Sequence, residues 1–122
     1  MKGTDPRPSE THVRQVHEYC DLLLPALREV ARQNGYAIAV HGSLERDIDL
    51  IVVPWCEMAL DHSMVISSLF TVVSAVFGGA GTKLHEPCEK PHGRLAYVIS
   101  FCGEHFIDLS IMPRVEKDPS ND

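Results

Sequence analysis

One stretch decides the expected fold of this chain, and it reads Val40-His41-Gly42-Ser43-Leu44-Glu45-Arg46-Asp47-Ile48-Asp49-Leu50-Ile51-Val52-Val53. A short apolar run over 36–40 leads into a Gly-Ser turn, and a second apolar run follows two aspartates. Asp47 and Asp49 alternate with aliphatic residues, and this period of two predicts a β-strand. Residues two apart on a strand share a face and are separated by about 6.6 Å of rise. We therefore expect both carboxylates to point the same way from one face of a sheet.

Two carboxylates side by side at the start of a core strand need a chemical explanation. Like charges on one face repel, and neither is easily removed from water alone. A divalent cation resolves the conflict, because Mg²⁺ is often held by one or two carboxylates plus substrate phosphates. A third acid, Asp108, lies within residues 106–112 and alternates with the aliphatic side chains in the same way. We expect it on a face that the aliphatic residues leave open, like the first two acids.

The Gly42-Ser43 turn, the Asp47-Ile48-Asp49 element and Asp108 on a later strand together resemble the signature of the DNA polymerase β-type nucleotidyltransferase superfamily. The resemblance covers roughly residues 36–114. Two further segments look like minimal stand-alone nucleotidyltransferase-like proteins of phages and prophages, namely 90–113 and 53–55.

This resemblance implies an α+β (α/β-type mixed-sheet) fold, with about four strands and helices covering one face. It also implies transfer of a nucleotidyl group from a nucleoside triphosphate to an unidentified acceptor hydroxyl, with Mg²⁺ or Mn²⁺ as cofactor. Asp47 and Asp49 would bridge two metal ions, and Asp108 would complete the ligation of the ion next to the acceptor. These three aspartates are the expected catalytic and metal-binding residues.

The expected nucleotide-binding residues are Gly42, Ser43, Lys90 and Arg94. A glycine lets the backbone approach a triphosphate closely, and Ser43 can donate its hydroxyl and backbone N–H to a phosphate. The two basic residues belong to a loop that we expect to approach the same face. The three residues Leu44, Glu45 and Arg46 make a shorter connection than is usual in the family.

The sequence leaves a second function open, which is a non-catalytic nucleotide-binding or partner-binding module of the same fold. Such a module would resemble the antitoxin-like half of a two-component system, with a protein partner or a second copy of the chain. A zinc cluster of His85, Cys88 and His92 is a weaker alternative, because the spacing matches no closed tetrahedral pattern.

Length and composition predict a single globular domain of 122 residues, with a loose leader over 1–8, the domain over 9–114 and a polar tail over 115–122. The net charge of −6 argues against a binder of extended nucleic acid. Four widely spaced cysteines without a CxxC motif indicate reduced thiols in a cytoplasmic protein. No secretion signal is recognisable in residues 1–10, and the longest apolar run, 64–77, is too short for a bilayer, so we expect no membrane partner.

Helical periodicity predicts a first helix through residue 31, capped by Ser9 or Thr11, with Pro25 either bending it or beginning a second helix. A later helix is expected over 57–77. Strands are expected over 36–41, 47–53, 94–101 and 106–112, and residues 82–93 are expected to form a loop.

Overall fold

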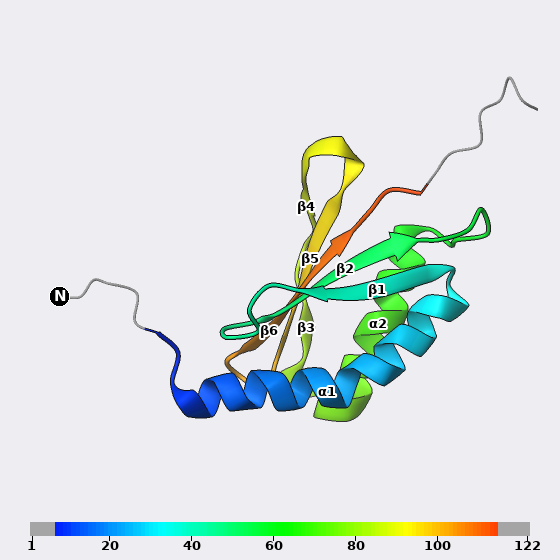
Figure 1. The fold of residues 1–122 in the computed structure, drawn as a ribbon. Coiled ribbons are helices and arrows are strands. Elements are labelled where there is room, and N and C mark those ends of the chain that lie inside the picture. Colours follow the sequence, from blue (N-terminus) through cyan, green and yellow to red (C-terminus); the bar gives the residue numbers. More distant parts are fainter. Residues whose placement is uncertain (1–6, 115–122) are drawn as a thin grey trace, which may run out of the picture.

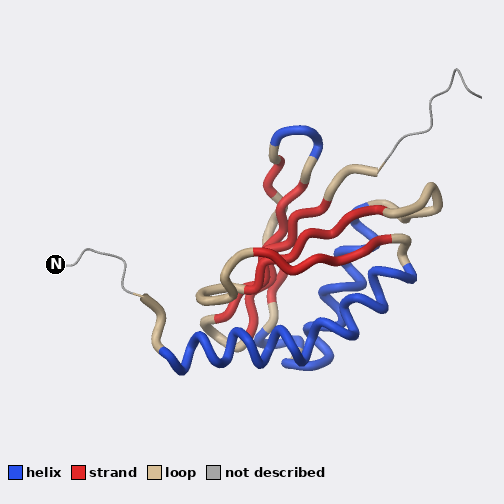
Figure 2. The backbone as a smooth tube through the Cα atoms, in the orientation of Figure 1, coloured by secondary structure: helices blue, strands red, loops and turns tan. Residues whose placement is uncertain are grey.

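In the computed structural model, which describes residues 7–114, two helices lie on the same face of one mixed sheet (Figure 1; Figure 2). The α+β fold class expected from the sequence is confirmed. Most of the expected leader and all of the expected tail, 115–122, lie outside the described residues. Within residues 7–114, neither helix is long and apolar enough to cross a membrane.

Helix α1 spans Glu10–Gln33 and begins where expected, because the Ser9 hydroxyl accepts a hydrogen bond from the His12 backbone N–H at 3.0 Å. Pro25 lies inside α1 and starts no second helix. The buried stripe continues past this proline on the side facing the sheet, through Val16, Cys20, Leu23, Leu27 and Ala31.

Helix α2 spans His62–Phe77, so it begins five residues later than residue 57, where the sequence placed its start. The reason is the Asp61 side chain, which accepts a hydrogen bond from the Ser63 backbone N–H at 3.2 Å and fixes the first turn. The glycines after Phe77 end the helix as expected, and Gly79–Gly81 forms a single 3-10 turn.

The four long strands match the expected segments to within one or two residues at each end. They are β1 (Tyr36–His41), β2 (Ile48–Pro54), β5 (Leu95–Phe101) and β6 (His105–Ile111). Residues 82–93 are not wholly loop, because β3 (Lys83–Leu84) and β4 (Cys88–Glu89) each pair with β5 and bring the sheet to six strands. Two-residue strands carry too little periodicity to be recognised in a sequence.

The sheet has the order β1-β2-β6-β5-β3, and β4 lies beside β5 off this path. The pairing of β2 with β6 is parallel, whereas the other pairings are antiparallel. In the parallel register, Asp49 lies directly beside Asp108 and Leu50 beside Leu109. Two strands from distant parts of the chain are thereby joined at the centre of the sheet.

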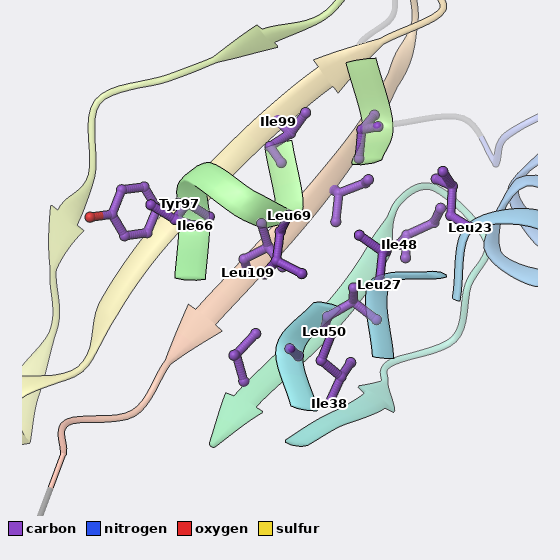
Figure 3. Packing of buried hydrophobic residues seen from close by; sticks show 14 of the residues in the cluster. Leu23, Leu27, Ile38, Ile48, Leu50, Ile66, Leu69, Tyr97, Ile99 and Leu109 are labelled. Atoms are coloured by element: carbon purple, nitrogen blue, oxygen red, sulfur yellow. The ribbon is translucent and has the colours of Figure 1, made fainter. Parts of the chain in front are cut away.

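The core lies between the sheet and the two helices (Figure 3). Leu50 of β2 and Leu109 of β6 are buried against Leu27 of α1 and Leu69 of α2, which are themselves fully covered. Alternation along each strand sends the residues on either side of each leucine to the opposite, open face. This open face carries Asp49 and Asp108.

The junction between α1 and β1 is closely packed at Gly35. Its φ is +86°, a left-handed conformation that favours glycine, and a Cβ placed there would lie 2.6 Å from the Ala59 Cα. The Gly35 carbonyl also accepts a hydrogen bond from the Trp55 N–H at 3.0 Å. The end of α1 is therefore held against the segment between β2 and α2.

We expect Gly35→Ala to lower the free energy of unfolding by about 2–4 kcal/mol, because a left-handed alanine and an overpacked contact each carry a cost. Chemical denaturation of both proteins measures the difference. Gly79→Ala is the matched control, since nothing lies within 4 Å of its added methyl group and its φ is not positive. Equal losses in the two variants would contradict the importance of the Ala59 contact.

Candidate active site

Three polar side chains form a row across the open face of the sheet. His41 of β1 pairs with Asp49 of β2, and Asp49 pairs with Asp108 of β6. Paired residues on neighbouring strands point to the same face, so the two carboxylates meet without any loop to place them. Rigid strands fix this part of the site.

A cavity of about 350 Å³ opens above the row. The structure brings four of the expected residues together in its wall: Ser43, Asp47, Asp49 and Asp108. The remaining lining residues are Arg7, Pro8, Glu45 and Arg46, all from the segment before α1 or the connection between β1 and β2. Four acidic residues and two arginines therefore line the same cavity.

The contact between Asp49 and Asp108 changes the acidity of Asp108. Its pKa is raised, first by burial and then by a side-chain hydrogen bond and charge repulsion from Asp49. The hydrogen bond has this effect because a protonated Asp108 donates it to the Asp49 carboxylate. The His41 side chain acts in the opposite direction and lowers the pKa of Asp108. The contact with Asp49 therefore favours the protonated form of Asp108.

Asp47 lies just before β2 rather than on it, because the strand begins at Ile48. Burial raises the pKa of Asp47, and the charge of Asp108 raises it further. His12, Arg46 and His105 lower it by their charges. All three aspartates therefore interact electrostatically through Asp108, although Asp47 belongs to the connection and not to the sheet.

Gly42 has a structural role beside Asp49. Its φ is +80°, and a Cβ at this position would lie 2.7 Å from the Asp49 Oδ2. The glycine therefore leaves the space that the Asp49 carboxylate occupies. The sequence predicted a glycine for close approach to a triphosphate, and the structure adds close approach to a carboxylate of the protein itself.

Lys90 and Arg94 do not line this cavity. They flank the turn between β4 and β5, where the Lys90 N–H donates to the Arg94 carbonyl at 2.8 Å. This turn projects from the end of the sheet at which Leu95 pairs with Ile111 (Figure 1). Ile111 follows Asp108 by three residues on β6. Arg7 and Arg46 are the cations at the cavity, and Arg46 could have been identified from its place beside Asp47.

A histidine pair contacts the connection between β1 and β2, and no local sequence pattern indicates it. His12 of α1 donates from Nε2 to the Arg46 carbonyl at 2.9 Å. Its ring stacks on His105 of β6, with centroids 4.6 Å apart and planes 4° from parallel. The pKa of His105 is lowered by burial and by His12. Helix α1 is thereby attached to the loop that carries Asp47.

The aspartates fit a divalent cation by the chemistry of their donor atoms. Mg²⁺ takes hard oxygen ligands and is commonly held by one or two carboxylates, with substrate phosphates and water completing its shell. Asp49 and Asp108 supply such a pair, and a cation bound between them would offset their repulsion. Within residues 7–114, no three His, Cys, Asp or Glu side chains are grouped closely enough to hold an ion by themselves. The same finding applies to His85, Cys88 and His92.

Two distant neighbours are described among the solved structures that resemble this chain. A cytoplasmic RNA terminal U-transferase aligns with a TM-score of 0.48 and 15% identity, over 86% of this chain and 30% of that chain. The GLD-2/RNP-8 complex aligns with a TM-score of 0.49 and 14% identity, over 86% of this chain and 38% of that chain. This chain therefore spans well under half of either neighbour. No protein-family model and no curated protein matches it.

Stability should depend on pH through Asp108. Because its pKa is raised, the folded protein holds this proton more tightly than the unfolded chain does. The stability contributed by this proton is fully present below the pKa of Asp108 in the unfolded chain, about 4. It is lost as the pH rises through the pKa of Asp108 in the folded protein. In a chelating buffer at pH 7, we expect Asp108→Asn to be more stable than wild type by about 0.5–2 kcal/mol, as when a strained functional site is relaxed.

Urea denaturation of both proteins between pH 4 and pH 7 measures this effect, and the difference between them should shrink toward pH 4. Asp21→Asn, on the exposed side of α1, is the control for loss of one negative charge. A stability difference for Asp108→Asn that does not change with pH would contradict the raised pKa of Asp108.

Proposed function

We propose that this chain transfers a nucleotidyl group from a nucleoside triphosphate to an acceptor hydroxyl, with Mg²⁺ or Mn²⁺ as cofactor. The observation that carries the proposal is the register of the parallel pair, which sets Asp49 beside Asp108 on the open face. A carboxylate pair that repels at neutral pH is explained by a cation that binds there. Asp49 and Asp108, with Asp47 from the same cavity wall, are the residues that would hold it.

When bound, a divalent ion stabilises the negative charge that develops on the phosphate oxygens. In the reaction, the acceptor oxygen forms a bond to the α-phosphorus, and the bond from that phosphorus to the bridging oxygen breaks. Pyrophosphate leaves with the bonding electrons, and the hydroxyl proton passes to a base. Solvent water can accept this proton, because Asp108 is assigned to the metal ion.

The phosphates find cationic and hydrogen-bonding groups in the same cavity. Arg46 and Arg7 line it, and a guanidinium can bind two phosphate oxygens at once. Ser43 follows Gly42 at the turn and offers its hydroxyl and its backbone N–H. Lys90 and Arg94 have no part in this proposal, because they do not border the cavity.

A second candidate is a module that binds nucleotides without reacting. One observation favours it: within residues 7–114, no three ligand-type side chains form a preassembled metal group. A single ion held by Asp49, Asp108 and a triphosphate would support binding, whereas the two-ion clamp of nucleotidyl transfer needs Asp47 as well. Activity, and not affinity, separates these candidates.

Thermal unfolding with nucleoside triphosphates and metal tests the site. Wild type should be stabilised only when both a triphosphate and Mg²⁺ or Mn²⁺ are present, by about 2.7 kcal/mol at 100 times the dissociation constant. Asp49→Asn should lose the effect, because it removes one of the two carboxylates in contact. Asp21→Asn should keep it.

Transfer itself is measured with triphosphates labelled at the α-phosphate and a pool of nucleotide, small-molecule and protein acceptors. Label incorporation that Asp47→Asn abolishes while metal-dependent stabilisation persists would establish the enzyme. Stabilisation without any transfer supports the binding module instead. If no triphosphate stabilises wild type with either metal, the proposed function is wrong.

A further inference from the structure

An aromatic ring stands exposed on the same strand face as the aspartates. Phe106 precedes Asp108 by two residues on β6, so both side chains point to the open face. Phe106 remains 39% exposed, whereas Ile107, the next residue along β6, points to the core and is fully buried. The ring therefore has no place in the core.

Phe106 borders a second cavity, of about 450 Å³, that continues the first. The two cavities share three lining residues: Pro8, Arg46 and Asp47. His12 of α1 also lines the second cavity, together with Phe106 of β6. The two cavities thus adjoin at the three shared residues, and together they form a groove, with the carboxylate pair bordering one end and Phe106 the other.

Groups of both charges line the carboxylate end, where Arg7 and Ser43 can bind phosphates once a cation offsets the acidic side chains. Glu104 lines only the aromatic end, where its carboxylate can accept hydrogen bonds from amino groups. The register across β5 places Ser100 and then Lys83 beside Phe106, outside the lining of the cavity, and the Ser100 hydroxyl lies 3.0 Å from His85 Nε2.

We propose that Phe106 is a stacking platform for a nucleobase held in the groove, in line with the aspartates. This inference rests on the proposed function for the phosphate end and adds the ligand of the aromatic end. Stacking suits an exposed phenyl ring, because every base has a π-face and such contacts are worth about 1–3 kcal/mol. The base belongs either to the triphosphate or to a nucleoside acceptor, and the two sources are separable.

The test compares Mg²⁺-dependent binding of ATP, inorganic tripolyphosphate and adenosine by calorimetry. Phe106→Leu keeps an apolar side chain but removes the ring, and Phe106→Tyr keeps the ring. If the donor base stacks, Phe106→Leu should weaken ATP binding about tenfold, leave tripolyphosphate within twofold of wild type, and be rescued by Phe106→Tyr. Trp55→Leu is the matched control, since this 59% exposed aromatic follows β2 at the other end of the sheet.

If the acceptor base stacks, ATP and tripolyphosphate should bind Phe106→Leu as they bind wild type. Adenosine, added with saturating tripolyphosphate and Mg²⁺, should then lose about tenfold in affinity. Unchanged affinities for all three ligands in Phe106→Leu would overturn the stacking platform while leaving the proposed function intact. If wild type binds adenosine through Phe106 but binds neither ATP nor tripolyphosphate, only the proposed function is overturned. If wild type binds none of the three ligands, the proposed function and the stacking platform are both overturned.

Discussion

The parallel contact between β2 and β6 is the constraint on which the rest of the structure depends. On its inner side, Leu50 and Leu109 are sealed beneath the helices, and burial of such side chains is worth about 1.5–3 kcal/mol each. On its outer side, the same register forces Asp49 against Asp108. The two faces cannot be separated, because a shift of one strand by one residue would exchange them. The apolar contacts therefore stabilise an arrangement that the carboxylates oppose.

Much of this arrangement could be predicted from periodicity. Alternation placed Asp49 and Asp108 on the open faces of their strands, and the Gly-Ser turn marked the end of β1. The Ser9 cap of α1 was predicted, but the start of α2 was not, since Asp61 and not an earlier residue fixes it. The two-residue strands beside β5 were missed because pairing with a long strand, and not local sequence, holds them in place.

The surroundings of the aspartates depend on tertiary contacts that a sequence does not display. Lys90 and Arg94 were selected as basic residues near a predicted hairpin, but the hairpin leads away from the cavity. Their place is taken by Arg46, which the short connection turns toward Asp47, and by Arg7 ahead of α1. The stack of His12 on His105 joins residues 93 positions apart, a separation over which no local pattern has meaning.

The separation of Asp49 from Asp108 along the chain has a consequence for how the protein acquires its native structure. The hairpin of β1 and β2 needs only local contacts, whereas β6 must close a loop of more than fifty residues before it meets β2. Non-local closure of this kind is slow, because chain entropy is lost before the contact is gained. During synthesis the first carboxylate is in place well before the second is translated. The groove therefore exists only once the last strand has docked, and cations in solution would accelerate this step by screening the repulsion that β6 meets on arrival.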